Sequence, residues 1–143
     1  MNRKENNMKP TLLYGGTSGA EKSEQMTPGK FIGRLFHAVT QAHMLHLTTK
    51  NGTHHDALGK LYEDLLDSAD ELAEVYQGCT GTQLDFTACP FEVPTDAQAW
   101  INELYECAET NRLVMGTEFH IQDLVGDVIS DIARAKYKLN FLS

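Results

Sequence analysis

Apolar residues recur every three or four positions in four stretches of this chain, a pattern typical of amphipathic α-helices. The first stretch runs from Thr27 to about Thr49, and the second from Thr53 to Gly78. The third begins at Thr95 and ends before residues 115–117, and the fourth follows that break. The positions expected to face the core are Phe31, Ile32, Leu35, Phe36, Val39, Ala42, Leu45, Leu58, Leu61, Tyr62, Leu65, Leu66, Ala69, Leu72, Ala73, Tyr76, Trp100, Ile101, Leu104, Tyr105, Ala108, Phe119, Ile121, Val125, Val128, Ile129, Ile132 and Leu139.

Residues that favour helix ends stand at the borders of these stretches. Thr27 followed by Pro28 predicts a helix start, because a hydroxyl caps the first turn and proline is tolerated at its first position. Thr53 is the expected cap of the second helix, and Gly78 its expected end. Thr95 and Gln98 have the spacing of a capping box for the third.

The lengths of the connections predict the topology. The first and last helix pairs are joined tightly, which favours two antiparallel hairpins. Residues 79–94 lack a helical pattern, and sixteen extended residues can span roughly 50 Å. A helix of about 25 residues is only about 38 Å long, so this segment can return the chain along the whole bundle. The sequence therefore predicts an all-α, ferritin-like four-helix bundle with a long crossover between its second and third helices.

Composition predicts a single domain with an N-terminal tail. Residues 1–26 are rich in Asn, Gly, Ser, Thr and Lys and are expected to be disordered, whereas residues 27–143 form the bundle. No apolar run is long enough for a membrane span or a secretion signal, which favours a cytoplasmic protein. The three cysteines, Cys79, Cys89 and Cys107, lack metal-motif spacing and fit a reducing compartment. A zinc site on Cys79 and Cys89 is a minor alternative.

Four residues have a spacing that predicts a metal site shared between two subunits. His43, His55, Asp70 and Glu74 offer imidazole and carboxylate, a ligand set that suits iron, with zinc and manganese as substitutes. Asp70 and Glu74 lie one turn apart on one helix face. However, fifteen residues separate His55 from Asp70, a rise of roughly 22 Å along one helix. If these groups share a metal, the histidines of one subunit must meet the acids of another in a two-fold dimer.

The segment QAHMLHLTTKNGTHHDALGKLYEDLLDSADELAEVYQG, which holds these residues, resembles the first helical hairpin of Dps, the ferritin-like DNA-protecting proteins of starved cells. Ala42-His43, His55, Asp70 and Glu74 match that family's pattern without a gap, although its tryptophan after the first histidine is Met44 here and a frequent acid is Gly59. FHIQDLVGDVISDIARAKYKLNFL is similar to the family's last helix. The resemblance implies an inter-subunit ferroxidase centre, iron storage, protection from hydrogen peroxide and a dodecameric shell.

Other polar residues carry weaker hypotheses. His46 lies three residues after His43 and is an auxiliary ligand or, more simply, a solvated side chain. The acids of the second helix, and those of the fourth, are candidate mineral or cation sites, with exposed acidic faces as the simpler interpretation. These acids are Glu63, Asp64, Asp67 and Glu71, and Asp123, Asp127 and Asp131. His37, His54 and His120 receive no role. The alternative for the whole chain is a non-catalytic interaction module that kept the fold and lost the metal chemistry.

The charge distribution predicts little or no DNA binding. Residues 1–25 carry four basic and three acidic side chains, and the rest carries eight basic and seventeen acidic ones. Affinity for the duplex depends on the phosphates that basic groups neutralise, and the acidic body repels it. A gel shift at neutral pH and about 150 mM salt should show no retardation, with or without residues 1–25. Tight retardation that disappears when these residues are deleted would contradict this prediction.

Overall fold

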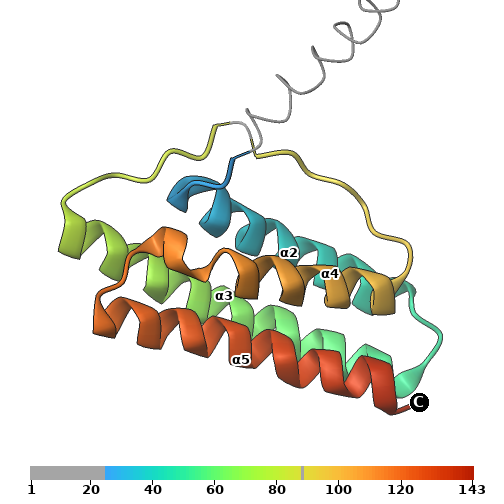
Figure 1. Cartoon of the computed structure of the whole chain (residues 1–143). Coiled ribbons are helices and arrows are strands. Elements are labelled where there is room, and N and C mark those ends of the chain that lie inside the picture. Colours follow the sequence, from blue (N-terminus) through green and yellow to red (C-terminus); the bar gives the residue numbers. More distant parts are fainter. Residues whose placement is uncertain (1–24, 88) are drawn as a thin grey trace, which may run out of the picture.

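The computed structural model describes residues 25–87 and 89–143, which form an all-helical bundle without strands (Figure 1). The predicted tail, apart from its last two residues, lies outside this part. The elements in chain order are α2 (Pro28–Thr48), α3 (Gly52–Thr80), α4 (Ala97–Thr110), the short 3₁₀ helix η1 (Arg112–Met115) and α5 (Phe119–Phe141). The prediction of a four-helix, all-α fold is confirmed for the described residues.

The borders of the first hairpin were predicted in part. The Thr27 hydroxyl accepts a hydrogen bond from the Lys30 amide at 3.2 Å, and Pro28 begins α2 as expected. The cap of α3 is Asn51 and not Thr53, since the Asn51 side chain accepts from the His54 amide at 3.0 Å. The amide side chain of asparagine caps a helix as well as a hydroxyl does, and Asn51 stands two residues before Thr53.

The borders of the long connection also differ from the prediction. α3 continues past Gly78 and ends at Gly81, which adopts the left-handed conformation with φ 70°. α4 is capped by Asp96 and not Thr95, because an Asp96 carboxylate oxygen accepts from the Gln98 amide at 3.1 Å. The predicted capping box is therefore wrong. The Gln98 side chain instead donates to the Leu139 carbonyl at 2.7 Å, which ties the start of α4 to the end of α5.

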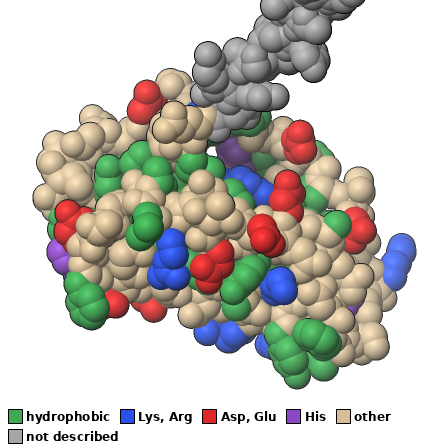
Figure 2. Space-filling view, viewed as in Figure 1, with side chains coloured by type: hydrophobic (Ala, Val, Ile, Leu, Met, Phe, Trp, Pro, Cys, Tyr) green, Lys and Arg blue, Asp and Glu red, His purple; other side chains and the backbone are tan. Residues whose placement is uncertain are grey.

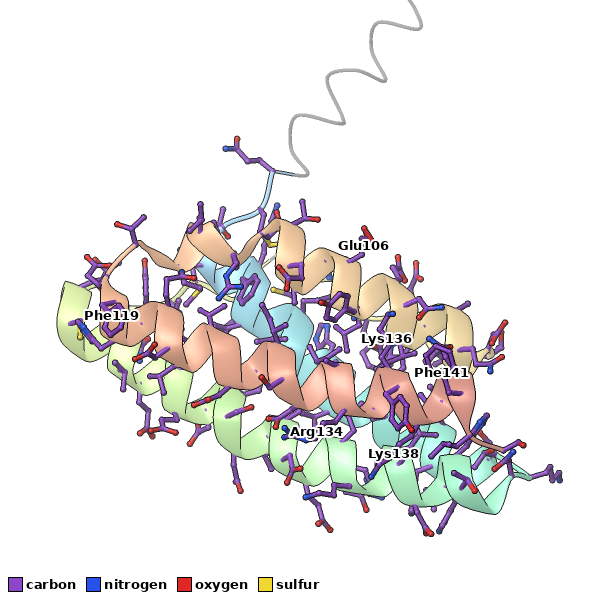
Figure 3. All side chains as sticks on the ribbon, turned by 60° about the horizontal axis from the view of Figure 1, so that its bottom comes forward. Glu106, Phe119, Arg134, Lys136, Lys138 and Phe141 are labelled. Atoms are coloured by element: carbon purple, nitrogen blue, oxygen red, sulfur yellow. The ribbon has the colours of Figure 1, made fainter. Side chains whose placement is uncertain are left out.

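The core is formed by α2, α3, α4 and α5 together with Met115 of η1, and α4 packs mainly against α5. Most predicted core positions are buried. Two predicted positions are wrong: Leu66 is 49% exposed and Phe119 is 81% exposed. Figure 3 shows Phe119 at the amino end of α5, pointing away from the bundle. Tyr105 is half-buried, with the Lys136 ammonium 5.2 Å from its ring centroid.

The connection between α3 and α4 lies along α2. Near its start the Asp85 backbone approaches Gly29 so closely that a Cβ on Gly29 would be 1.9 Å from the Asp85 carbonyl oxygen. Further on, His37 Nδ1 lies 3.1 Å from the Pro90 carbonyl oxygen, and Gln41 donates to the Glu92 carbonyl at 2.7 Å. Figure 1 shows this segment running from the end of α3 to the start of α4, above the helices.

The visible α4–α5 side carries acidic and basic side chains interspersed (Figure 2), with no large area of one sign. Of the helices that the structure describes, none combines the length and apolar character needed to cross a membrane.

Gln41 joins three separate parts of the fold. It is 6% exposed, and its side-chain oxygen accepts from the Trp100 indole N–H at 2.9 Å and from Arg34 at 3.1 Å. Its amide nitrogen donates to Glu92 in the connection. Gln41 therefore links α2, α4 and the connection. A buried donor that loses its hydrogen-bond partner costs about 1–3 kcal/mol of stability.

The Gln41→Leu variant tests this role. We expect the free energy of unfolding to fall by about 2–4 kcal/mol, because the Trp100 indole N–H and the Glu92 carbonyl lose their partner. Gln83→Leu, an exposed change on the same connection, should alter it by less than about 0.5 kcal/mol. Urea unfolding measures both variants. Equal effects at the two positions would remove the special role of Gln41.

Candidate metal centre

Two histidines interlock where α2 ends and α3 begins. The rings of His46 and His55 stack with centroids 3.7 Å apart and an angle of 21°. Nδ1 of each ring lies 2.8 Å from the backbone carbonyl oxygen of the other residue. A carbonyl oxygen only accepts, so Nδ1 carries the proton in both rings. In the neutral rings the lone pair is therefore on Nε2, the atom that would bind a metal.

His43 extends this cluster by one turn of α2. Its ring stacks on Tyr62 of α3 with centroids 4.2 Å apart, and its centroid is 6.0 Å from that of His46. The Tyr62 ring also meets His46 edge-on at 5.5 Å. His43 and His55 are exposed, whereas His46 and Tyr62 are half-buried. The structure therefore brings the two predicted histidine ligands into one aromatic cluster, which we call the histidine cluster (His43, His46, His55 and Tyr62).

The ring of His46 lies close to the backbone of Gly59, in the space that a larger residue would fill. A Cβ at position 59 would lie 3.0 Å from Cε1 and 3.1 Å from Nδ1 of that ring. These distances are tighter than ordinary contacts, so a Cβ at position 59 would require the imidazole to shift by a few tenths of an ångström. The simple interpretation of His46 as a solvated side chain is wrong, since its ring is half-buried and hydrogen-bonded across the hairpin. The sequence signal for this arrangement is the pairing of a histidine on α2 with a glycine on α3.

The predicted carboxylates lie elsewhere on α3. Asp70 and Glu74 are exposed, one turn apart, and separated from His55 by fifteen and nineteen residues of one continuous helix. That separation corresponds to roughly 22 Å or more. In the described part of the chain, no three His, Cys, Asp or Glu side chains are close enough to hold a metal ion together. Within one subunit the four predicted ligands therefore form two separate halves.

The two halves share one side of α3. His55, Gly59, Tyr62, Leu66, Asp70 and Glu74 follow each other at intervals of three or four residues, which places them along one helical stripe. Exposed apolar side chains occur on the same two helices as the ligands: Leu66 within this stripe of α3, and Met44 and the 70% exposed Leu47 on α2. We call this surface the histidine–carboxylate face. An exposed apolar group of this kind often marks a protein interface.

The other acidic residues have mixed roles. Asp64 forms an ion pair with Lys60 at 2.8 Å within α3. Asp123 and Asp127 are exposed, but Asp131 packs between α3 and α5 and accepts from the Ser68 hydroxyl at 2.7 Å. Burial raises the pKa of Asp131 above its usual range, against the lowering effects of Ser68 and Arg134. Asp131 thus contributes a structural hydrogen bond instead of extending an exposed acidic stripe.

The remaining histidines and cysteines have partners that the sequence did not predict. His54 Nε2 lies 3.2 Å from the Leu142 carbonyl oxygen, and His37 contacts the long connection. Cys79 Sγ is 3.1 Å from His120 Nε2. Cys89 lies beside α2, with Sγ 3.9 Å from the Gly29 carbonyl oxygen. Cys79 and Cys89 therefore contact different helices, which does not favour the zinc alternative.

Replacing Gly59 by alanine tests the packing of the histidine cluster. Glycine-to-alanine changes inside helices usually stabilise by about 0.5–1 kcal/mol. At Gly126 of α5 a Cβ would meet nothing within 4 Å, so Gly126→Ala should give this gain. Gly59→Ala should lose it and shift the imidazole ¹⁵N signals of His46 and His55. Unfolding and NMR spectra measure both, and equal stabilisation with unchanged histidine signals would contradict the packing.

Comparisons with known proteins give a family and no function. No curated protein and no solved structure shows a significant match to the chain. The model of a family of unknown function, DUF5856, matches residues 46–139. This match covers about two thirds of the chain, beginning at His46 and including His55, Asp70 and Glu74. The chain therefore belongs to the DUF5856 family.

Proposed function

We propose that this protein is a Dps-like member of the ferritin-like superfamily that binds Fe(II) between two subunits and oxidises it with hydrogen peroxide. The observation that carries the proposal is the division of the four ligands into two exposed halves: His43 of α2 with His55 at the start of α3, and Asp70 with Glu74 further along α3. Each half lacks what the other supplies, because imidazole and carboxylate together suit Fe(II). A second copy of the chain, related by a two-fold axis, completes two equivalent sites.

The donor atoms favour iron as the substrate. In the histidine cluster the Nδ1–H groups of His46 and His55 point at carbonyl oxygens, so Nε2 is left for the metal. Asp70 and Glu74 are exposed carboxylates whose negative charge balances Fe(II) and, after oxidation, Fe(III). Each hydrogen peroxide accepts the electrons of two Fe(II) ions and, with two protons, becomes water. Oxidation by this route consumes peroxide without releasing a free radical.

The surface around the ligands supports a dimer. Met44, Leu47 and Leu66 lie on the same two helices as the ligands and are exposed in the single chain. Covering them with a second copy would bury apolar area, at about 25 cal/mol per Å². The same contact would bring the acids of one subunit toward the histidines of its partner. Interface and metal site are therefore one surface in this proposal.

The arrangement of the helices supports the ferritin-like assignment. The connection between α3 and α4 has contacts along α2, and the start of α4 is tied to the end of α5 by Gln98 and Leu139. The end of α5 in turn meets the start of α3, where Thr53 donates to the Ser143 carbonyl at 3.2 Å. α3 and α4 thus begin at the same end of the bundle, as the one-crossover topology requires. Dodecameric assembly follows from the resemblance to Dps.

A subunit-complementation experiment tests the shared site. One variant carries His43→Ala and His55→Ala, and the other carries Asp70→Ala and Glu74→Ala. Each alone should lose Fe(II) oxidation, followed as ferric absorbance after addition of peroxide to the anaerobic Fe(II)-loaded protein. A mixed dimer made by co-expression with two tags should regain about half of the wild-type activity per dimer, since one of its two sites holds all four ligands.

Four outcomes would overturn parts of the proposal. Absence of rescue in the mixed dimer would contradict a site shared between subunits. A stable 16.0 kDa monomer by light scattering at micromolar concentration would remove the interface itself. Oxidation that is unchanged in both variants, or a protein that binds no iron, zinc or manganese, would favour the alternative of a non-catalytic interaction module.

A further inference from the structure

A thiol and an imidazole meet at the end of α3 that is far from the histidine cluster. Cys79 is in the last turn of α3, and His120 is the second residue of α5. Cys79 Sγ and His120 Nε2 lie 3.1 Å apart, within hydrogen-bonding distance, and both residues are exposed. Figure 3 shows the amino end of α5, marked by Phe119, beside the carboxyl end of α3.

The environment of Cys79 differs from that of the other two cysteines. Cys89 and Cys107 are half-buried. Cys89 Sγ faces a backbone carbonyl at 3.9 Å, and Cys107 Sγ faces the Asn111 side-chain amide at 3.8 Å. Neither a carbonyl nor an amide can take up a thiol proton under ordinary conditions. Of the three cysteines, all of which the structure describes, Cys79 is the one in contact with a base.

The surface around Cys79 is open to small reactants. A Cβ added at Gly78 or at Gly81, on either side of the last turn of α3, would meet nothing within 4 Å. The thiolate is the reactive form of cysteine, and an adjacent imidazole activates it by accepting its proton. An exposed thiol without an enclosing pocket is suited to a small oxidant that needs no binding site of its own.

We propose that Cys79 is a peroxide-reactive thiol for which His120 is the proton acceptor. The Cys79 proton passes to His120 Nε2, and the sulfur attacks one oxygen of hydrogen peroxide. The S–O bond forms as the O–O bond breaks, and the departing hydroxide takes the proton from the imidazolium as water. Cys79 is oxidised to a sulfenic acid and the peroxide is reduced. One molecule of a small thiol such as glutathione then forms a mixed disulfide with Cys79 and releases water, and a second molecule releases the Cys79 thiol and leaves as the oxidised disulfide.

Alkylation kinetics separate activation from exposure. The Cys89→Ser, Cys107→Ser variant isolates Cys79, and N-acetylcysteine amide serves as a fully exposed reference thiol. Iodoacetamide at neutral pH should modify Cys79 roughly tenfold faster than the reference, because an exposed but unactivated thiol would only equal it. His120→Gln keeps the size of the side chain and removes the base, so the rate should return to that of the reference.

His54→Gln, at the other end of the bundle, is the matched control and should leave the rate unchanged. In a chain that keeps all three cysteines, the alkylation rate of the half-buried Cys107 reports on folding. If His120→Gln accelerates the alkylation of Cys107, that variant has partly unfolded, and the His120→Asn variant is used in its place. A Cys79 rate equal to that of the reference, or one unaffected by either His120 variant, overturns the proposal.

A second readout identifies the product. Hydrogen peroxide is added in the presence of EDTA, followed by dimedone, and peptide mapping locates the adduct. Dimedone should label Cys79 in the wild type and His54→Gln, and should label it several-fold less in His120→Gln. The EDTA and a repeat in the His43→Ala, Glu74→Ala background keep this test independent of iron. Label on Cys89 or Cys107 but not on Cys79 would also overturn the proposal.

Discussion

The continuity of α3 as one uninterrupted helix is the constraint on which the candidate metal centre depends. A single helix from Gly52 to Thr80 holds His55 and Asp70 at a fixed separation, and its regular rise sets that separation at roughly 22 Å. No rearrangement of side chains can close such a distance, because even a long side chain reaches only a few ångströms. α3 can place His55, Asp70 and Glu74 along one side, but it cannot bring them to one metal. If they act together, the symmetry of an oligomer has to do what the fold of one chain cannot.

The histidine cluster illustrates how the residue at one position of a hairpin constrains the residue at another. Glycine inside a helix costs about 1 kcal/mol relative to alanine, so Gly59 needs a compensating gain. The ring of His46 occupies the space above it, stacks on His55 and forms one of two reciprocal hydrogen bonds. These bonds hold both rings in the tautomer with Nε2 unprotonated when neutral. Gly59 and His46 are therefore one feature, because the absence of a side chain at 59 leaves room for a third imidazole beside the two predicted ligands.

Periodicity predicted the helices and most of the core, because burial of one helix face imposes its spacing on the sequence. Periodicity did not identify the helix caps where two nearby residues could both serve as the cap. Asn51 and Thr53 are both good caps, as are Thr95 and Asp96, and contacts such as that of Gln98 with Leu139 decide between them. Leu66 fits the apolar period of α3 and is nevertheless exposed. The Cys79–His120 contact joins residues 41 positions apart, and nothing in the local pattern of either helix indicates it.

α3 carries His55 near one end and Cys79 near the other, and this separation limits how the thiol can interact with the histidine cluster of its own subunit. His55 and Cys79 are 24 residues apart on the same helix, a rise of about 36 Å. A thiolate at Cys79 therefore cannot ligate a metal held by the histidine cluster of its own subunit. In the proposed dimer the shared site is closer to the thiol, because Glu74 lies five residues before Cys79 on α3, a rise of about 7.5 Å. Iron oxidation would remove peroxide in proportion to the iron present, whereas Cys79 would respond to peroxide even when iron is scarce.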